Sequence, residues 1–376
     1  MTWETIRMTM NENKKAGIIT IVDLTNYGNR LQNYAVSEVL KKKGIESETL
    51  NFVECSSSKR VMCEIKQAFR SVPFIYDSVL FLMGKKSLKK KRIYCFNKFS
   101  RKYLPVKNFC VDEKDDLKRL QDKYDYFVIG SDQIWNPEYG HAKKQSFAFF
   151  AKEEQKICFS PSFGVSTIKE KYQEEIAKCL SAIPNISVRE SAGIDIVKEL
   201  SGKNAEVLID PTMMLNADEW RKIQENPGVD IQKKYILSYF IGKRTKEHDA
   251  KIKEWKEKYG LEEYKLLDAQ DVELYCANPG AFVSLIEHAT IVCTDSFHGS
   301  VFSILFGKPF VVFQRNGDGG GTSSRLDTLL GTFALTNRYV HNIEEADLFD
   351  CDYQESYSIL EKERKKVDEF LNKSFS

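Results

Sequence analysis

Apolar runs of strand length alternate with amphipathic helical stretches along most of the 376-residue chain. The first unit is predicted as a buried strand over 17–24, a helix over 29–43 and a second strand over 45–53. Further strands are predicted at 124–130, 156–159, 186–188, 206–209, 235–241, 264–267, 289–294 and 309–313, and helices at 246–258, 280–287, 299–306 and 354–373. Because strands and helices alternate in two consecutive series, the pattern predicts two parallel sheets covered by helices.

The length and this alternation predict an α/β protein with two Rossmann-like domains that face each other across a cleft. A chain of 376 residues is too long for one ordinary core. We place the N-terminal domain at 1–215, the C-terminal domain at 216–352 and a final helix at 353–376. Residues from about 60 to 110 are helical in pattern, basic and poorly alternating, so we interpret them as an insertion in the first domain. A ligand site is expected in the cleft between two such domains.

Composition and cysteine usage limit the class and the compartment. Hydrophobic residues make up 42% and charged residues 29%, with a net charge of +2, as in a folded globular protein. The nine cysteines show no CxxC spacing, which argues against a disulfide framework or a zinc site and suits a reducing compartment. The sequence shows neither an apolar leader nor a stretch of about 20 apolar residues, so we expect a cytoplasmic protein. No cluster has metal-ligand spacing, and we expect no metal or other cofactor.

His298 is the first candidate for chemistry. It follows the predicted strand over 289–294 in a short polar turn and precedes Gly299, which allows a close backbone approach. Ligands of open α/β sheets bind at the carboxyl ends of the strands, and an imidazole there can serve as an acid or a base. The alternative is a histidine that caps the following helix. The position alone leaves both interpretations open.

Two other turns offer groups that bind anions. Arg189 follows the predicted strand over 186–188, where its guanidinium can hold a carboxylate or phosphate by two hydrogen bonds, or can pair with Glu190. In the first turn, from Asn26 to Asn29, the helix N-terminus offers free N–H groups to an anion, while either asparagine can be a plain N-cap. No GxGxxG motif is present, which disfavours dinucleotide binding.

The loop after the strand over 124–130 has the character of a sugar site. Asp132 and Gln133 supply planar hydrogen-bonding groups and Trp135 an apolar plate, although a helix cap and a core tryptophan explain the same residues. Asp210-Pro211 is interpreted as a structural turn. The glycine-rich segment 317–325 is either a surface loop or a lid that brings Arg325 to a ligand.

Taken together, these motifs resemble one family. Asn26-Tyr-Gly-Asn-Arg30, Tyr126–Asp132, Ser187-Val-Arg-Glu190, Ile209-Asp-Pro211 and Thr294-Asp-Ser-Phe-His-Gly299 with Phe306-Gly-Lys-Pro309 occur in the order found in the polysaccharide pyruvyl transferases, from about residue 17 to 315. The resemblance implies a fold similar to GT-B glycosyltransferases, with the final helix packing back on the first domain. It also implies transfer of the enolpyruvyl carbons of phosphoenolpyruvate to two sugar hydroxyls, which forms a cyclic ketal on a precursor of a cell-surface polysaccharide (capsule or exopolysaccharide) and releases phosphate.

The resemblance also assigns roles to the candidate residues. It implies that His298 and Arg189 are catalytic, His298 as general acid and base and Arg189 as a donor-binding group. The remaining donor-side candidates are Ser296, Lys308, Arg315 and Arg325, and the acceptor-side candidates in the first domain are Asn26, Asn29, Asp132, Gln133 and Trp135. The chain departs from the family at Ser296 and Asn29, where many members have arginine and aspartate. Where some members use a lysine, it has Asp318.

The basic segment suggests a partner beyond the two substrates. No acidic residue occurs between Ser78 and Val111, and the apolar run Val79–Met83 is followed by the cationic stretch Lys85–Arg92. This segment could contact an anionic membrane or the diphosphate of a polyprenyl-linked acceptor, or it could be a solvated helix with Val79–Met83 buried. We expect no nucleic-acid partner. The alternative functions are a glycosyltransferase that uses a nucleotide sugar and a non-catalytic glycan-binding protein.

Overall fold

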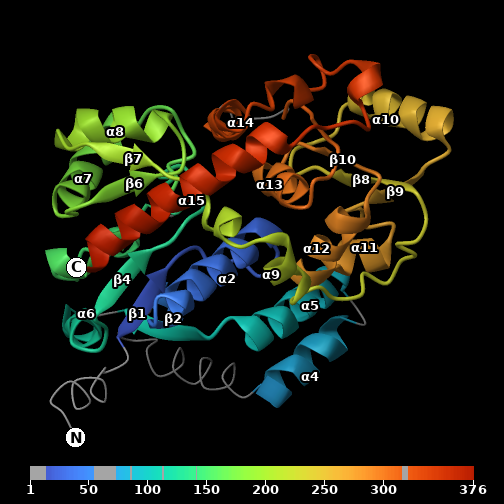
Figure 1. The fold of residues 1–376 in the computed structure, drawn as a ribbon. Helices are drawn as coiled ribbons and strands as arrows, with labels where there is room; N and C mark the ends of the chain where they lie inside the picture. The colour runs from blue at the N-terminus through green and yellow to red at the C-terminus, as the bar shows by residue number, and fades with distance from the viewer. Residues whose placement is uncertain (1–13, 55–72, 85–86, 112–113, 141, 316–320) are drawn as a thin grey trace, which may run out of the picture.

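The first sheet is parallel and has the strand order of a Rossmann-like domain. The structure, a computed structural model, describes residues 14–54, 73–84, 87–111, 114–140, 142–315 and 321–376. The strands β1 (Lys15–Ile19), β2 (Glu46–Glu54), β3 (Val106–Val111), β4 (Tyr126–Ile129) and β5 (Lys156–Cys158) lie in the order β3-β2-β1-β4-β5 (Figure 1). The helices α2 (Tyr27–Lys42) and α6 (Lys114–Gln121) connect them. The positions of β2, β4, β5 and α2 follow the predicted periodicity closely, whereas β1 ends before the strand predicted over 17–24 does.

A small second sheet continues the first domain. The strands β6 (Ile186–Val188) and β7 (Ala205–Val207) pair in parallel and carry the helices α7 (Glu170–Ser181) and α8 (Ala192–Ser201). The periodicity predicted two sheets, and this separate pair is a third, so that prediction is corrected. The reason is local: past β5 the backbone turns through Ser160 (φ 53°), whose N–H donates to the Ser187 hydroxyl instead of to a strand backbone.

The third sheet forms the core of the second domain. The strands β8 (Tyr235–Tyr239), β9 (Glu262–Lys265), β10 (Ile291–Thr294) and β11 (Phe310–Val312) are parallel in the order β11-β10-β8-β9. The helices of this half are α9 (Ala217–Arg221), α10 (Lys246–Tyr259), α11 (Val272–Cys276), α12 (Pro279–His288), α13 (Phe297–Leu305) and α14 (Gly321–Thr332). Short 3-10 turns complete the described chain: η2 (Lys144–Phe147), η3 (Glu153–Gln155), η4 (Pro211–Met214), η5 (Thr336–Arg338) and η6 (Glu345–Asp347). The chain is therefore an α/β protein with two Rossmann-like domains.

The predicted helical insertion is helical only in part. The helices α4 (Pro73–Gly84) and α5 (Leu88–Tyr103) pack on each other, and residues 55–72 lie outside the described residues. The end of the insertion, however, is the strand β3, which pairs with β2 at the edge of the first sheet. Because Lys107 and Asn108 stand in an edge strand, their polarity concealed the strand pattern.

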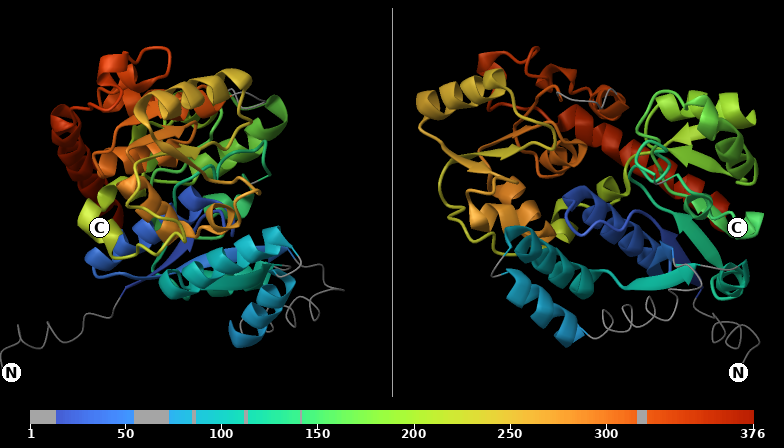
Figure 2. Two further views of the ribbon diagram at one scale, coloured as in Figure 1. Left: turned by 90° about the vertical axis from the view of Figure 1, so that its right-hand side faces the viewer. Right: turned by 180° about the vertical axis from the view of Figure 1, so that it is seen from behind.

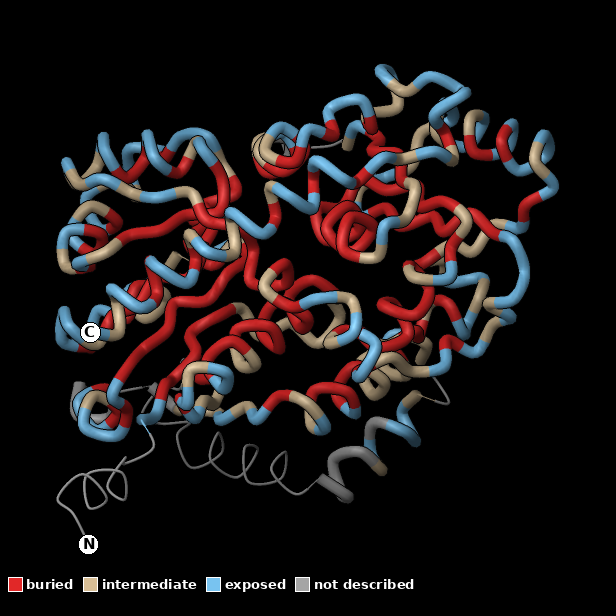
Figure 3. The backbone as a smooth tube through the Cα atoms, in the orientation of Figure 1, coloured by how far each residue is buried: buried red, intermediate tan, exposed pale blue. Residues whose placement is uncertain are grey.

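One hydrophobic cluster includes buried residues of both domains, and Figure 3 shows buried segments of both domains near the centre of the molecule. The Tyr27 ring of α2 stacks on Phe282 of α12, with ring centroids 4.5 Å apart, and its hydroxyl donates to the Ala277 carbonyl (3.0 Å). The C-terminal helix α15 (Gln354–Phe375) returns across the first domain, as Figures 1 and 2 show. There Arg364 Nε donates to the Met213 carbonyl (2.8 Å). None of the helices that the structure describes is long and apolar enough to span a membrane.

Candidate active site

A cavity of about 230 Å³ lies between the two domains at the carboxyl ends of their strands. Both halves of the molecule supply its walls, and we call it the inter-domain cavity. From the first domain come Ile21, Asp23, Asn26, Asn29, Asp132, Gln133 and Tyr139, and from the second come Ile241, Ser296, Phe297, His298, Arg315 and Arg325. Seven side chains proposed from sequence for donor or acceptor binding thus reach one space: Asn26, Asn29, Asp132, Gln133, Ser296, Arg315 and Arg325. His298 is the eighth.

His298 crosses the boundary between the domains. It is the second residue of α13, and Ser296, not the histidine, caps that helix by accepting from the Gly299 N–H (3.4 Å). The imidazole lies against Gly28 of α2 so closely that a Cβ at Gly28 would be 2.5 Å from the ring Cγ. Gly28 of the first domain therefore leaves the space that the His298 imidazole of the second domain occupies.

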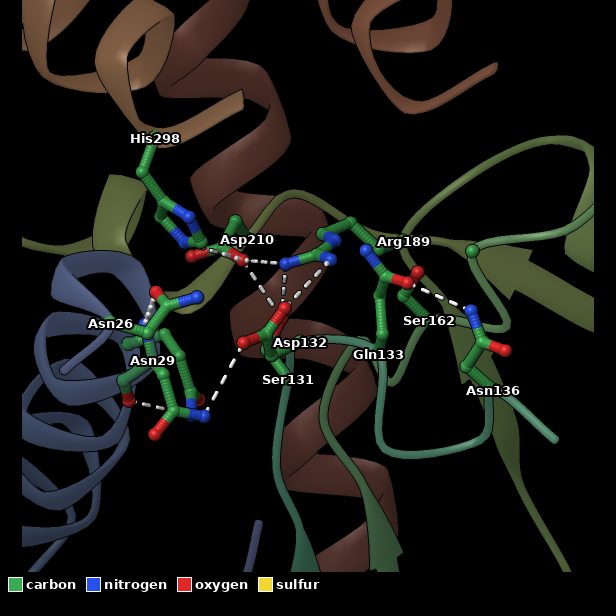
Figure 4. A network of polar contacts seen from close by, with 12 residues as sticks. Asn26, Asn29, Ser131, Asp132, Gln133, Asn136, Ser162, Arg189, Asp210 and His298 are labelled. Carbon is green, nitrogen blue, oxygen red and sulfur yellow. Dashed lines mark hydrogen bonds and ion pairs between the residues drawn. The ribbon is translucent and has the colours of Figure 1, made fainter. Parts of the chain in front are cut away.

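The imidazole faces a buried carboxylate of the first domain (Figure 4). His298 Nε2 is 3.7 Å from Asp210 Oδ2, the same oxygen that accepts from Arg189 Nη1 (2.7 Å). The other oxygen, Oδ1, accepts from the Thr212 N–H and hydroxyl. Burial would raise the pKa of Asp210, but His298 and Arg189 more than offset burial, so the pKa is lowered. Asp210 is thus an ionised carboxylate that faces the imidazole, the arrangement that orients a catalytic histidine.

Arg189 lies behind the inter-domain cavity. Its side chain is 1% exposed, its Nη2 is 3.6 Å from Asp132 Oδ1, and its guanidinium lies 4.7 Å from the Phe297 ring centroid. Burial would lower the pKa of Arg189, but the charges of Asp210 and Asp132 raise it. The adjacent Glu190 does not pair with Arg189: its Oε1 accepts from the Ser162 hydroxyl and from the N–H groups of Phe163 and Gly164. The guanidinium therefore binds two carboxylates of its own domain and is not one of the residues in the cavity wall.

Asp132 connects the two halves of the network. It has a left-handed backbone (φ 72°), uncommon for a residue with a side chain and typical of positions that a site over-determines. Its Oδ2 accepts from Asn29 Nδ2 (3.3 Å). Burial would raise the pKa of Asp132, but Arg189, His298 and Arg325 lower it. An ionised carboxylate therefore faces the cavity beside the imidazole.

Two arginines of the second domain give the opposite wall its positive charge. Arg325 is only 5% exposed, and no ion pair joins it to a carboxylate of the described residues. With the Gln133 amide assigned so that its oxygen faces the guanidinium, that oxygen accepts from Nη1 (3.0 Å) and Nη2 (2.5 Å). Burial, and then the charge of Arg189, lower the pKa of Arg325 to about 10. Arg315 is held by Asp295, through Nε to Oδ2 (3.3 Å) and Nη2 to the carbonyl (2.9 Å). Among the described residues no three His, Cys, Asp or Glu side chains gather as metal ligands do.

A family model for polysaccharide pyruvyl transferases matches residues 26–317, more than half of the chain. The chain belongs to this family. The match includes the first turn of α2, the residues of the carboxylate network and the His298 turn. No curated protein is significantly similar in sequence.

Solved structures resemble the chain only distantly. The UDP-GlcNAc 2-epimerase from Neisseria meningitidis is 11% identical, with a TM-score of 0.44 over 96% of this chain and 100% of the epimerase. The corresponding epimerase from Methanocaldococcus jannaschii is 11% identical, with a TM-score of 0.48 over 95% and 99%. The glycosyltransferase SnogD from Streptomyces nogalater is 10% identical, with a TM-score of 0.38 over 96% and 96%. At this distance nothing about substrate follows.

The family motif in the first turn is explained residue by residue. Asn26 is the N-cap of α2, accepting from the Asn29 N–H (3.0 Å), and Gly28 makes room for His298. Asn29 Oδ1 accepts from the Asp23 N–H (3.0 Å) and from Arg30, whose Nη2 also donates to the Ile21 carbonyl (2.7 Å). The motif therefore forms the part of the cavity wall that Asn26 and Asn29 line. The helix-cap interpretation of Asn26 is also confirmed.

Two proposed site residues lie elsewhere. Trp135 is fully buried; its ring stacks on Phe147 at 5.0 Å and its Nε1 donates to the Ser146 carbonyl, so it belongs to the core. Lys308 precedes β11, at the amino end of the strand and beyond the far end of α13 from His298. Neither lines the inter-domain cavity. Both predictions used position in the sequence, which does not give the direction of a side chain.

Two residues were missed or misread. Asp210 was interpreted as a structural turn, which it also is, since its Oδ1 caps η4. Its position directly after a strand, before a proline, was the available signal. Tyr139, 60% exposed, is an aromatic residue at the cavity rim that was not predicted from sequence, whereas for Trp135 both a sugar plate and a core tryptophan had been left open. Asp318 lies outside the described residues.

Proposed function

We propose that the inter-domain cavity transfers the enolpyruvyl group of phosphoenolpyruvate to two hydroxyls of a sugar, forming a pyruvate ketal on a cell-surface polysaccharide precursor and releasing phosphate. Family membership gives the reaction class. The observation that carries the proposal is one imidazole placed between a cationic wall and a wall of carboxylate and amide groups, each from a different domain. Such a division suits an anionic donor and a neutral, hydroxyl-rich acceptor.

The donor belongs on the second-domain wall. Phosphoenolpyruvate carries a carboxylate and a phosphate, and Arg315 and Arg325 are fork-shaped cations that can hold both. Arg325 supports this role most strongly, because a buried guanidinium without a carboxylate partner among the described residues is costly unless a ligand neutralises it. Ser296, at the N-terminus of α13, adds a hydroxyl at the cationic end of that helix.

The acceptor belongs on the first-domain wall. Asp132 and Asn29, which are already hydrogen-bonded to each other, offer oxygens to sugar hydroxyls, and Gln133 reaches the boundary with Arg325. At the rim, the exposed ring of Tyr139 can cover the apolar face of a sugar. These groups are planar and mostly uncharged, as hydroxyl recognition requires. Whether the acceptor is free or linked to a polyprenyl diphosphate does not change this arrangement.

The reaction balances with one acid–base group. The methylene carbon of the donor takes up a proton, the central carbon bonds to one sugar oxygen, and phosphate leaves with cleavage of its bond to that carbon. The second sugar oxygen then bonds to the same carbon. Of the two hydroxyl protons released, one ends on the new methyl group and the other on phosphate. His298 can relay them, since an imidazole gives and takes protons in turn, with a typical effect of about 10²–10⁴-fold.

Asp210 and Arg189 are positioning residues in this scheme. Asp210, held ionised by Arg189 and His298, fixes the orientation of the imidazole ring. Arg189 fixes Asp210 and Asp132 together without touching the donor. We further propose that no metal or organic cofactor takes part, because Arg315 and Arg325 provide the positive charge for phosphate; activity should then survive a chelating agent.

Mass spectrometry tests the proposal directly. Purified protein is incubated with phosphoenolpyruvate and a p-nitrophenyl galactoside, since the family resemblance points first to galactose-type acceptors. The expected product carries the mass of a pyruvyl ketal, with one phosphate released per ketal. His298→Ala should lose both signals while keeping the thermal unfolding temperature. Substantial phosphate release by a folded His298→Ala protein contradicts the role of His298, and transfer from a nucleotide sugar instead contradicts the function.

A further inference from the structure

A contiguous apolar patch lies on α4, far from the cavity. Ten large apolar side chains are exposed among the described residues, and four of them lie within five positions of this helix: Val79, Phe81, Leu82 and Met83, between 37% and 59% exposed. Figure 2 shows α4 on the outside of α5, away from the sheets. Single exposed apolar residues are common, whereas contiguous patches mark interaction sites. The alternative that these side chains are buried in the first domain is therefore wrong.

Positive charge without counter-charge lies beside the patch. Lys89 is exposed and Lys90 half-buried at the start of α5, and no ion pair joins either of them, or Lys98, to a carboxylate of the described residues. The rest of the predicted cationic stretch has other roles or is undescribed. Lys91 pairs with Glu273 (3.4 Å), and Lys85 and Lys86 lie outside the described residues.

Arg92 is removed from the surface altogether. It is 3% exposed, donates to the Thr25 carbonyl (2.7 Å), the Tyr27 hydroxyl (3.1 Å) and the Tyr275 carbonyl, and so ties α5 to both domains. The prediction that it contacts a membrane is wrong. Its burial also fixes the orientation of α5, and through the packing of α4 on α5 it fixes which face of α4 is outermost.

We propose that α4 and the start of α5 form a docking surface for an anionic lipid bilayer. Leu82 and Met83 would enter the interfacial region while Lys89 and Lys90 meet the head groups, the division that amphipathic membrane-surface segments use. Charge decides against a second copy of the chain as the occupant, since two such surfaces would bring like-charged lysines together. The proposal does not depend on the reaction in the cavity.

Vesicle co-sedimentation of the full-length protein tests this surface. Vesicles of phosphatidylcholine alone are compared with vesicles that also contain phosphatidylglycerol. Binding is expected only with the anionic lipid and should weaken with added salt. Lys89→Gln with Lys90→Gln should lower the partition coefficient by about tenfold or more, and Leu82→Gln with Met83→Gln by a similar factor. The matched controls are Lys253→Gln with Lys256→Gln on α10, and Ile194→Gln on α8, which should bind like the wild type.

Each other outcome overturns the proposal. These are wild-type protein that stays in the supernatant, equal binding to both kinds of vesicle, or unchanged binding by either α4–α5 double variant. Analytical ultracentrifugation of the same proteins identifies the competing occupant: a dimer that dissociates on Leu82→Gln with Met83→Gln would assign the patch to a second copy. Lys89, Leu82 and Met83 are exposed and Lys90 is half-buried, so thermal unfolding should change little, and its measurement for each variant controls for folding. No donor or acceptor is used, so failure here leaves the proposed reaction intact.

Discussion

Adding one methyl group to α2 should slow the reaction strongly although no polar residue is replaced. In Gly28→Ala the new Cβ would lie 2.5 Å from His298 Cγ, and closer still to two other ring atoms, where ordinary contact begins at 3.4 Å. The imidazole must therefore move by about 1 Å or more, away from Asp210 or out of line with the donor. A displacement of about 1 Å in a reacting group can cost on the order of 10²-fold in rate.

The assay is phosphoenolpyruvate-dependent phosphate release with an acceptor, read together with thermal unfolding. We expect kcat to fall about 100-fold for Gly28→Ala, with little loss of stability, because alanine is the better helix former by about 0.5–1 kcal/mol. Gly331→Ala on α14 is the matched control, since nothing lies within 4 Å of the added Cβ. A Gly28→Ala enzyme with wild-type kcat would refute the argument that His298 needs this site empty.

The remaining predictions concern the charges and the two aromatic residues. Asp210→Asn should lower the free energy of unfolding by about 3 kcal/mol near neutral pH. Because the folded-state pKa of Asp210 is lowered, the difference in stability from wild type should shrink as the pH falls below 3.8, the ordinary aspartate value. Urea titrations in which this difference stays constant below pH 3.8 would count against the ion pair. Arg325→Met should raise the KM for phosphoenolpyruvate at least about tenfold. The unfolding temperature should stay equal or rise, because a buried guanidinium without a carboxylate partner among the described residues destabilises the fold. A large drop in unfolding temperature would contradict this account of Arg325. Trp135→Ala should cost about 3–5 kcal/mol of stability, whereas Tyr139→Ala should change stability by less than about 0.5 kcal/mol and raise only the acceptor KM; the reverse pattern would return the acceptor plate to Trp135.

The sequence alone was sufficient for most of the fold, since long periodic segments are governed by local pattern. The helix predicted over 29–43 is α2, and the strand predicted over 186–188 is β6. The pattern failed at β3, where an edge strand carries polar residues. It also failed after Ile19, where the predicted strand continues but the chain leaves the sheet and Ile21 becomes cavity wall.

The turns that form the site could be predicted from the sequence, but the directions of their side chains could not. Turns after strands gather at one edge, so His298, Arg189 and Asp132 could be brought together from sequence. Whether a side chain faces the cavity or lies behind it depends on partners far along the chain. Arg189 was predicted to bind the donor; in the structure it donates to Asp210, 21 positions away, and is not among the residues that line the cavity. No local pattern carries that information.

The contact between His298 and the first domain has a consequence for timing. The imidazole belongs to the second domain, and the Asp210 carboxylate that orients it belongs to the first, 3.7 Å away. Any hinge rotation that admits substrate by parting the lobes would separate this pair before it disturbed either lobe internally. Under the proposed function, an open enzyme would then be inert toward phosphoenolpyruvate, and hydrolysis by bulk water would be suppressed until both substrates were enclosed.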